Sequence, residues 1–533
     1  MFASLRRHPL ARPLLYATAV VAIALPLQAQ SAGDVLVLVH GNDTISVERV
    51  HRTRERLEGE MLLKAAGARI TFSVDVDAQG RATALNNAFR MATADVKSEP
   101  AQTAKARFTA DSVIVDIAGG GRNVTQRFAT RAGAVPFFNP SFSMVELMIQ
   151  RARIIGGDSV GVPVWNLQGG TTEVVSVVRR GPDSVVVMLG AVPARLAVSA
   201  NGDILGGVVP TQGINIVRGR AASGAMVVEK PDYSAPPGAP YTAEEVTVPT
   251  PQGHTLAGTL TLPKDRKGRV PAVVTITGSG PEDRDEAIPP VKGYRPFRQV
   301  ADTLGRHGIA VLRMDDRGFG ASTGNHAAAT SADFADDIRS ALAYLRTRPE
   351  IDPTRLALVG HSEGGLIAPL VASTDPSLRG IVLMAGPSQT GRQILRYQFG
   401  NSIKRDTSYK GARRDSALKT VDGMIDSLAK SSPWLTYFLD YDPIATARKV
   451  KVPTLIMQGV TDKQVTQEQA VALEQAMRAG GNRRVTRHMF TEANHLFAQD
   501  PDGNPEKYAS LPQPRVRSDV LATLLTWLQA TLR

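Results

Sequence analysis

The stretch Gly360-His361-Ser362-Glu363-Gly364 has the residue types and spacing of a reactive serine turn, and a short apolar run leads into it. A serine flanked in this way is typical of a sharp strand-to-helix turn, which holds the serine hydroxyl above the edge of a sheet. Because glycine lacks a Cβ, neighbouring backbone can pass close to such a turn. The amides that open the following helix then face any negative charge that develops on a substrate. We therefore predict that Ser362 is a nucleophile, the alternative being an ordinary strand-to-helix turn.

A serine hydroxyl is a weak nucleophile, so it needs a base, and that base needs an acid to orient it. With this kind of turn, the order along the chain is serine, acid, histidine. Two histidines follow Ser362: His488 lies inside a predicted strand, whereas His495 lies in the loop just beyond that strand. A side chain in the loop can reach the turn more easily, so we predict that His495 is the base.

Asp462 is the candidate for the acid, because it lies in the loop directly after the apolar strand predicted at 454–458. Glu468 and Glu474 fall on the helix that follows and lie too far along the chain. All three members of the predicted triad thus come at the carboxyl ends of strands, where the side chains of a parallel sheet meet. The predicted triad is Ser362, Asp462 and His495.

The elements that must position these residues lie between residues 241 and 533, where predicted strands and helices alternate. This alternation is typical of a mostly parallel α/β sheet. The predicted parallel strands are 270–277, 309–314, 355–359, 381–385, 454–458 and 485–490. Thr330 with Asp333, and Thr466 with Gln469, have the spacing of helix N-caps. Residues 387–450 interrupt the alternation with helical patterns, and an insertion of that length indicates a cap over the sheet edge.

Residues 33–230 are rich in β-branched runs separated by turn signals, and this pattern favours an antiparallel β-rich domain, either a sandwich or an open barrel. The clearest runs are 69–76, 112–117, 173–178 and 184–189. One helix is predicted at 143–153. This part contains no catalytic constellation. The proline-rich stretch 231–240 is typical of a stiff linker, so we place the domain boundary there.

The chain has 533 residues, of which 43% are hydrophobic, so it is long enough for two or three domains with sizeable cores. It contains no cysteine, which excludes disulfides, thiolate metal sites and a cysteine nucleophile. The formal net charge is +12. Because the sequence has no dense basic run and no zinc-ligand spacing, the excess charge indicates a solvated basic surface rather than a nucleic-acid site. We expect no metal and no cofactor.

Residues 1–29 have the features of a secretory signal. Arg6, Arg7 and Arg12 supply positive charge, and 14–25 is an apolar core within the ~7–15 residues expected of such signals. This core is shorter than the ~20 apolar residues of a membrane span, so an uncleaved anchor is the weaker alternative. We expect a periplasmic or secreted protein without an integral membrane span after cleavage.

These motifs together resemble the α/β-hydrolase superfamily, and more closely the bacterial carboxylesterases of the serine aminopeptidase and prolyl-oligopeptidase-like group. The resemblance rests on Thr277-Gly-Ser-Gly-Pro-Glu-Asp-Arg-Asp285, Asp315-Asp-Arg-Gly-Phe-Gly320, Gly360-His-Ser-Glu-Gly-Gly365, Leu439-Asp-Tyr-Asp-Pro443, Gln458-Gly-Val-Thr-Asp462 and Asn494-His495. It covers 241–533 and implies an α/β-hydrolase fold, a mostly parallel sheet flanked by helices with a helical cap insertion. Members often have His-Gly where this chain has Thr277-Gly278. We expect the charged loops Asp283-Arg284-Asp285 and Asp315-Asp316-Arg317 to form a structural ion-pair network.

The resemblance also implies an oxyanion hole formed by the backbone amides of Ser279 and Glu363. It implies a serine hydrolase that cleaves carboxylic esters through an acyl-enzyme, with a small-molecule ester or a short peptide as substrate. An aminopeptidase or acylaminoacyl peptidase with the same triad is the alternative, and its substrate amine would need an acidic anchor. The candidates for that anchor are Glu363, Asp440 and Asp442. A catalytically inert binding protein is a third option.

Overall fold

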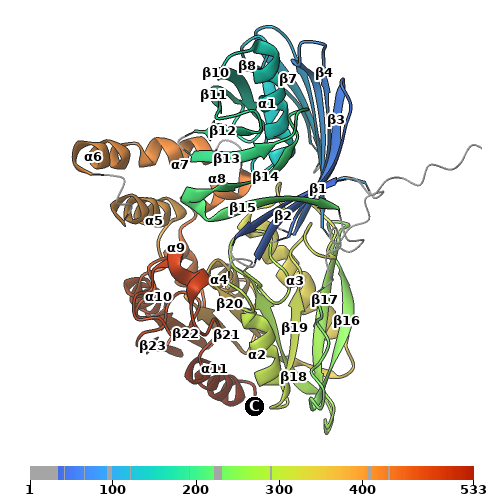
Figure 1. Cartoon of the computed structure of the whole chain (residues 1–533). Helices are drawn as coiled ribbons and strands as arrows, with labels where there is room; N and C mark the ends of the chain where they lie inside the picture. The colour runs from blue at the N-terminus through green and yellow to red at the C-terminus, as the bar shows by residue number, and fades with distance from the viewer. Residues whose placement is uncertain are drawn as a thin grey trace, which may run out of the picture.

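The computed structural model describes residues 34–40, 43–64, 67–92, 99–119, 122–190, 192–220, 231–288, 291–405, 410–429 and 432–533. The predicted signal segment, residues 1–29, lies outside these described residues. Two β-sheets dominate the described chain, one of fifteen strands and one of eight (Figure 1). The predicted linker, residues 231–240, lies between them in the sequence.

The first sheet is a continuous meander in which β1 and β15 pair at the centre. Its strands are β1 (Asp34–His40), β2 (Asp43–Arg52), β3 (Arg56–Leu63), β4 (Ala68–Val76), β5 (Ala82–Met91), β6 (Gln102–Phe108), β7 (Ser112–Gly119), β8 (Arg122–Ala129), β9 (Val135–Phe137), β10 (Ser159–Asn166), β11 (Thr171–Arg179), β12 (Ser184–Leu189), β13 (Val192–Val198), β14 (Ile204–Val209) and β15 (Ile214–Arg220). Neighbouring strands run antiparallel, except that β9 and β10 are parallel. A short 3-10 helix, η1 (Pro210–Gln212), precedes β15.

Helix α1 (Phe142–Ile155) packs against this sheet, and every residue from Phe142 to Ile149 is buried. One apolar core holds these residues together with side chains from both halves of the sheet, such as Leu57 of β3 and Val187 of β12. The buried carboxylate of Glu48 accepts the Phe142 N–H at 2.7 Å, which places a negative charge at the helix N-terminus. The helix predicted at 143–153 is therefore confirmed.

The antiparallel, β-rich character predicted for this part is confirmed, but the sandwich alternative is wrong. All fifteen strands belong to one sheet, because the pairing of β1 with β15 joins the strands at the start and at the end of this part of the chain. Among the described strands, the two ends of the sheet, β8 and β9, are not paired with each other. The arrangement is thus an open sheet that shares its core with one helix.

The proline-rich stretch, residues 231–240, contacts residues that follow it in the sequence and belong to the part of the chain with the second sheet. The Tyr233 ring lies 4.2 Å from the Arg284 guanidinium, and its hydroxyl donates to Asp283 at 3.2 Å. Arg298 donates to the carbonyls of Asp232 and Ser234. This stretch therefore packs against the part of the chain that forms the second sheet.

The second sheet has the order β16-β17-β19-β18-β20-β21-β22-β23. Its strands are β16 (Tyr241–Pro249), β17 (Thr255–Pro263), β18 (Val270–Ile276), β19 (Ala310–Met314), β20 (Ile351–His361), β21 (Gly380–Met384), β22 (Thr454–Gly459) and β23 (Val485–Phe490). Strands β18 to β23 are mutually parallel, while β16 and β17 are antiparallel additions. The predicted parallel strands are thus confirmed in kind and place.

Helices cover both faces of this sheet. One face packs against α3 (Ser331–Thr347), α4 (Gly364–Ala372) and α10 (Gln467–Ala479), and the other against α2 (Pro296–Gly305) and α11 (Ser518–Thr531). The predicted capping pair of Thr330 and Asp333 is formed in full. The pair of Thr466 and Gln469 is not, because the Gln469 side chain accepts the Ser388 N–H at 3.1 Å.

Five helices lie between β21 and β22 in the described part of the region predicted as a cap. They are α5 (Gly391–Arg405), α6 (Gly411–Lys419), α7 (Val421–Ala429), α8 (Pro433–Asp440) and α9 (Pro443–Ala447). Helix α8 carries Trp434 and Phe438, whose rings stack at 5.1 Å. A second 3-10 helix, η2 (Pro505–Ser510), follows β23. Among the described residues, no helix is both long and apolar enough to cross a membrane.

Candidate active site

Ser362 lies at the turn between β20 and α4, in the left-handed backbone region with φ 51°. The glycines around it are required by close backbone contacts. A Cβ on Gly360 would lie 2.0 Å from the Gly364 carbonyl oxygen, and one on Gly364 would lie 2.1 Å from the Ile276 carbonyl oxygen. The Ser362 N–H donates to the Met384 carbonyl at 2.9 Å, which fixes the turn to the neighbouring strand. The sequence signature therefore folds as the strained strand-to-helix turn it predicts.

His495 and Asp462 are in direct contact: His495 Nδ1 lies 2.8 Å from Asp462 Oδ2, and both side chains are buried. The other carboxylate oxygen of Asp462 accepts the backbone N–H groups of Gln464 at 2.8 Å and Val465 at 3.0 Å. Gln458 donates to Asp462 Oδ2 at 3.0 Å. This carboxylate is therefore fixed by four hydrogen bonds and can hold one tautomer of the imidazole.

The histidine and the acid that the sequence analysis disfavoured as base and orienting acid make other contacts. His488 is exposed on β23, and its ring lies 4.5 Å from that of Phe490 at a tilt of 45°. Glu474 on α10 forms ion pairs with Arg478 and Arg487. Their positions agree with the reasons for which the sequence disfavours them.

Several residues near this site have a strained backbone conformation with positive φ. The non-glycine residues at positive φ in the described chain are Glu286, Ser362, Ala385, Glu492 and Phe497. Ala385 directly follows β21, and the last two flank His495. Such conformations cost ~1–3 kcal/mol each and persist where surrounding structure enforces them, as at functional sites. The described non-glycine residues at positive φ thus include the nucleophile itself and residues in the loops that follow β21 and β23.

The loop that follows β18 lies beside the nucleophile, since the Cβ position of Gly278 falls 3.5 Å from Ser362 Cβ. Within the described chain, neither the Ser279 amide nor the Glu363 amide donates a hydrogen bond to another residue. One of these amides lies in the loop after β18 and the other at the serine turn, and neither is bonded to another described residue. This fits the requirement of an oxyanion hole, whose donors must be free to meet a developing negative charge.

Glu363, the residue after Ser362, sends its carboxyl group into the protein. Ser331 at the start of α3 donates to Glu363 Oε1 at 2.6 Å, and the Trp434 indole of α8 donates to the same oxygen at 2.8 Å. Burial raises the pKa of Glu363 more than these bonds and one from Ser279 lower it. This carboxyl ties a cap helix to the nucleophile turn, a role for Trp434 that the sequence analysis missed.

His361 and Glu286 form a second buried pair that sequence reasoning missed. His361 Nδ1 lies 2.6 Å from Glu286 Oε1, and His361 Nε2 lies 2.9 Å from the His495 carbonyl oxygen. His361 was visible only as a neighbour of the nucleophile. The one sequence signal for Glu286 is its place near the end of the glycine-rich loop 277–285.

Buried acids surround the loop. Burial raises the pKa of Asp316 well above its ordinary value, and burial together with the charge of Glu286 does the same for Glu282. The predicted structural ion-pair network is present, because Arg284 binds Asp315 through two bonds of 2.9 Å, Nε to Oδ1 and Nη2 to Oδ2. In the described chain, no three His, Asp or Glu side chains are grouped so as to hold a metal ion.

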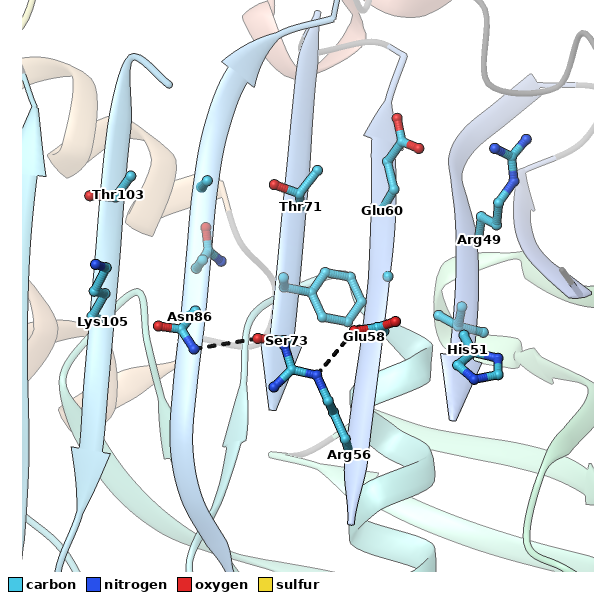
Figure 2. A pocket seen from close by; sticks show the side chains of 15 residues that line it. Arg49, His51, Arg56, Glu58, Glu60, Thr71, Ser73, Asn86, Thr103 and Lys105 are labelled. Carbon is cyan, nitrogen blue, oxygen red and sulfur yellow. Dashed lines mark hydrogen bonds and ion pairs between the residues drawn. The ribbon is translucent and has the colours of Figure 1, made fainter. Parts of the chain in front are cut away.

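A hollow of about 780 Å³ lies elsewhere, on the outer face of strands β2 to β6 (Figure 2). Its wall includes Arg49, His51 and Lys105, and the ion pair of Arg56 with Glu58 is visible within it. None of its lining residues comes from the second sheet. Ser73, His51 and Glu58 line it, but Ser73 accepts from Asn86 and Glu58 pairs with Arg56, so the strained turn remains the candidate active site.

Two protein-family models match this chain. The model of the serine aminopeptidases (S33) matches residues 293–405, and that of the prolyl oligopeptidase family matches residues 429–533. The first match contains the nucleophile turn, and the second contains Asp462 and His495.

Several known proteins are similar to part of the chain. Esterase EstD of Thermotoga maritima is 26% identical over 56% of this chain and 70% of its own length. An uncharacterized 31.7 kDa protein of Escherichia coli is 27% identical over 36% of this chain and 75% of its own length. The structure of a Pyrococcus furiosus esterase covers 57% of this chain and 96% of that one, with 16% identity and a TM-score of 0.41.

The strand order, with helices on both faces and a serine turn after β20, defines an α/β-hydrolase. Within that class, two segments of the chain are similar to the serine aminopeptidase and prolyl oligopeptidase families, and the chain is a hydrolase.

Proposed function

We propose that this protein hydrolyses carboxylic esters through an acyl-enzyme formed on Ser362. The Ser362 hydroxyl attacks the ester carbonyl as His495 takes its proton. The oxyanion that forms accepts hydrogen bonds from the amides of Ser279 and Glu363. When the tetrahedral intermediate collapses, His495 returns the proton to the leaving alcohol. Water, activated by the same histidine, then attacks the acyl-enzyme and releases the carboxylic acid.

The contact between His495 and Asp462 is the observation that carries this proposal. A 2.8 Å hydrogen bond from Nδ1 to a buried carboxylate leaves Nε2 of a neutral imidazole unprotonated. The His495 ring also lies 4.9 Å from the ring of His361, the residue adjacent to Ser362. A base in the correct tautomer is therefore next to the nucleophile turn.

The surroundings of two of the three candidate amine anchors, Glu363 and Asp442, favour an ester over a peptide with a free amino terminus, while Asp440 is exposed. Glu363 is buried and already accepts hydrogen bonds from Ser331 and Trp434. Asp442 caps α9 by accepting the N–H groups of Ile444 and Ala445. Both carboxyl groups therefore already hold helices of the protein in place, Glu363 through α3 and α8 and Asp442 through α9.

Two measurements test the proposal. A fluorophosphonate probe should label the wild-type protein on Ser362 and fail to label Ser362→Ala, which should be folded but inactive. p-Nitrophenyl acetate and butyrate should be turned over, while alanyl and leucyl p-nitroanilides should not. His488→Ala is the matched control for His495→Ala, and it should keep most of the activity because its side chain points to solvent. Turnover of the anilides alone would establish a peptidase instead.

We also infer that the protein is exported, on the strength of the basic and apolar pattern of residues 1–29. Expression of the full chain in a bacterium with an outer membrane should yield a periplasmic or secreted product that begins near residue 30. N-terminal sequencing of the recovered protein measures this, and an intact residue 1 in the cytoplasmic fraction would contradict it.

A further inference from the structure

One buried carboxylate contacts two separate parts of the candidate site. Glu286 Oε1 accepts the N–H of Gly278 at 3.0 Å, and Gly278 is the residue before the proposed oxyanion donor Ser279. The same oxygen lies 2.6 Å from His361 Nδ1. Glu286 is 1% exposed, so water does not compete for either bond. The loop after β18 and the end of β20 are thus joined at a single atom.

His361 extends this connection to the loop of the base. Its Nε2 faces the His495 carbonyl oxygen at 2.9 Å, and a carbonyl can only accept, so Nε2 carries a proton. Its Nδ1 faces the Glu286 oxygen that already accepts the Gly278 N–H, so Nδ1 donates as well. Burial by itself lowers the pKa of His361, but the charge of Glu286 and these hydrogen bonds outweigh it and raise that pKa. Both ring nitrogens of His361 therefore face oxygen acceptors, and this setting favours the protonated imidazole.

Two further features fix this arrangement. Glu286 is in the left-handed backbone region, with φ 56°, a conformation that a glutamate adopts only when its surroundings enforce it. Tyr294, from the segment just beyond it, donates its hydroxyl to the Leu496 carbonyl at 2.9 Å, one residue after the base. The backbone on both sides of the His495 peptide linkage is thus bound by side chains from outside its own loop.

We propose that Glu286 and His361 are positioning residues, a buried carboxylate–imidazolium pair that sets the oxyanion loop and the backbone of His495 relative to Ser362. This inference rests on the proposed function. Neither side chain takes part in bond making in that scheme. Each acts through the backbone it holds, at Gly278 on one side and at His495 on the other.

The consequence for the reaction is geometric. Nucleophile, base and oxyanion donors come from three strand ends, and a displacement of ~1 Å at such a site can lower the rate ~10²-fold. Glu286→Gln keeps the shape and one acceptor oxygen but removes the charge that maintains the imidazolium. A neutral His361 can then satisfy only one of its two acceptors with an N–H. We expect kcat to fall ~10–100-fold with KM changed less than about twofold, because the lost alignment matters in the transition state.

The test compares Glu286→Gln and His361→Gln with Glu48→Gln in the full-length protein. Glu48 is an equally buried carboxylate in the first sheet, hydrogen-bonded to Ser141, Ser143 and the start of α1. Steady-state kinetics with p-nitrophenyl butyrate and thermal melts are recorded for each. The two site variants should show the kcat loss. The control should melt at a lower temperature and keep its kcat.

Wild-type kcat in either folded site variant would overturn the inference, and so would an equal loss of kcat in the control. If Glu286→Gln does not fold, His361→Gln decides the outcome, since its shorter amide can meet only one of the two acceptors. Ser362→Ala is measured beside them. If that variant keeps turnover, the proposed triad fails; if it is inactive while both site variants are unaffected, only the positioning inference fails.

Discussion

Asp462→Asn is the most selective perturbation of the proposed triad, because it preserves the side-chain shape and changes one acceptor into a donor. Asparagine can place its oxygen at the Oδ1 site and keep the N–H bonds of Gln464 and Val465. Its NH₂ group then occupies the Oδ2 site, which lies 2.8 Å from His495 Nδ1. Two donors cannot face each other there, so the neutral imidazole must carry its proton on Nε2.

An imidazole protonated on Nε2 cannot accept the proton of Ser362. The equivalent asparagine substitution in a serine triad lowers kcat ~10⁴-fold, which corresponds to about 5 kcal/mol at ~1.36 kcal/mol per factor of ten. The change also removes one acceptor of the Gln458 side-chain N–H groups, at 3.0 Å, but these keep the Val465 carbonyl at 2.9 Å, so the cost to folding should be that of one hydrogen bond, ~0.5–1.5 kcal/mol. We therefore expect a folded, somewhat less stable protein with almost no turnover.

The assay is kcat for p-nitrophenyl butyrate together with a thermal melt of each variant. Asp500→Asn is the matched control, since Asp500 is a buried acid in the same loop region that binds the Asn494 side chain at 3.1 Å. More than a tenth of the wild-type kcat in Asp462→Asn would refute the reasoning, as would a larger loss in the control.

Three further predictions concern packing and pH. Trp434→Phe removes the indole N–H that binds Glu363 at 2.8 Å, so a melt should show a loss of ~1–3 kcal/mol, and an unchanged melt would argue against that bond. Gly364→Ala would place a Cβ 2.1 Å from the Ile276 carbonyl oxygen, so denaturant unfolding should show a loss of ~1–3 kcal/mol or more; wild-type stability would contradict the contact. Burial raises the pKa of Asp316 well above its ordinary value, so the folded state binds this proton more tightly than the unfolded state. Stability should therefore fall as pH rises above ~3.9 and through the folded pKa, and a melting temperature that climbs from pH 5 to pH 8 would oppose this sign.

Most of the proposed site could be predicted because its signals are local. The spacing around Ser362, a histidine just past a strand and an aspartate just past another each occupy a few consecutive residues. Parallel strands bring their carboxyl ends to one edge, so the three positions follow from strand prediction alone. The same locality explains why α1 and the strands of the second sheet were predicted in place.

The connections between these parts depend on the tertiary structure. His361 meets Glu286 across 75 residues and the His495 carbonyl across 134, and no local pattern marks such partners. The single fifteen-stranded sheet likewise requires Asp34 to pair with Arg220. Sequence by itself determined which residues could do the chemistry, since periodicity and turn residues act over one or two turns of chain. Folding decided which buried polar groups support them, because a hydrogen-bond partner for a buried carboxyl is fixed by three-dimensional packing and not by spacing along the chain.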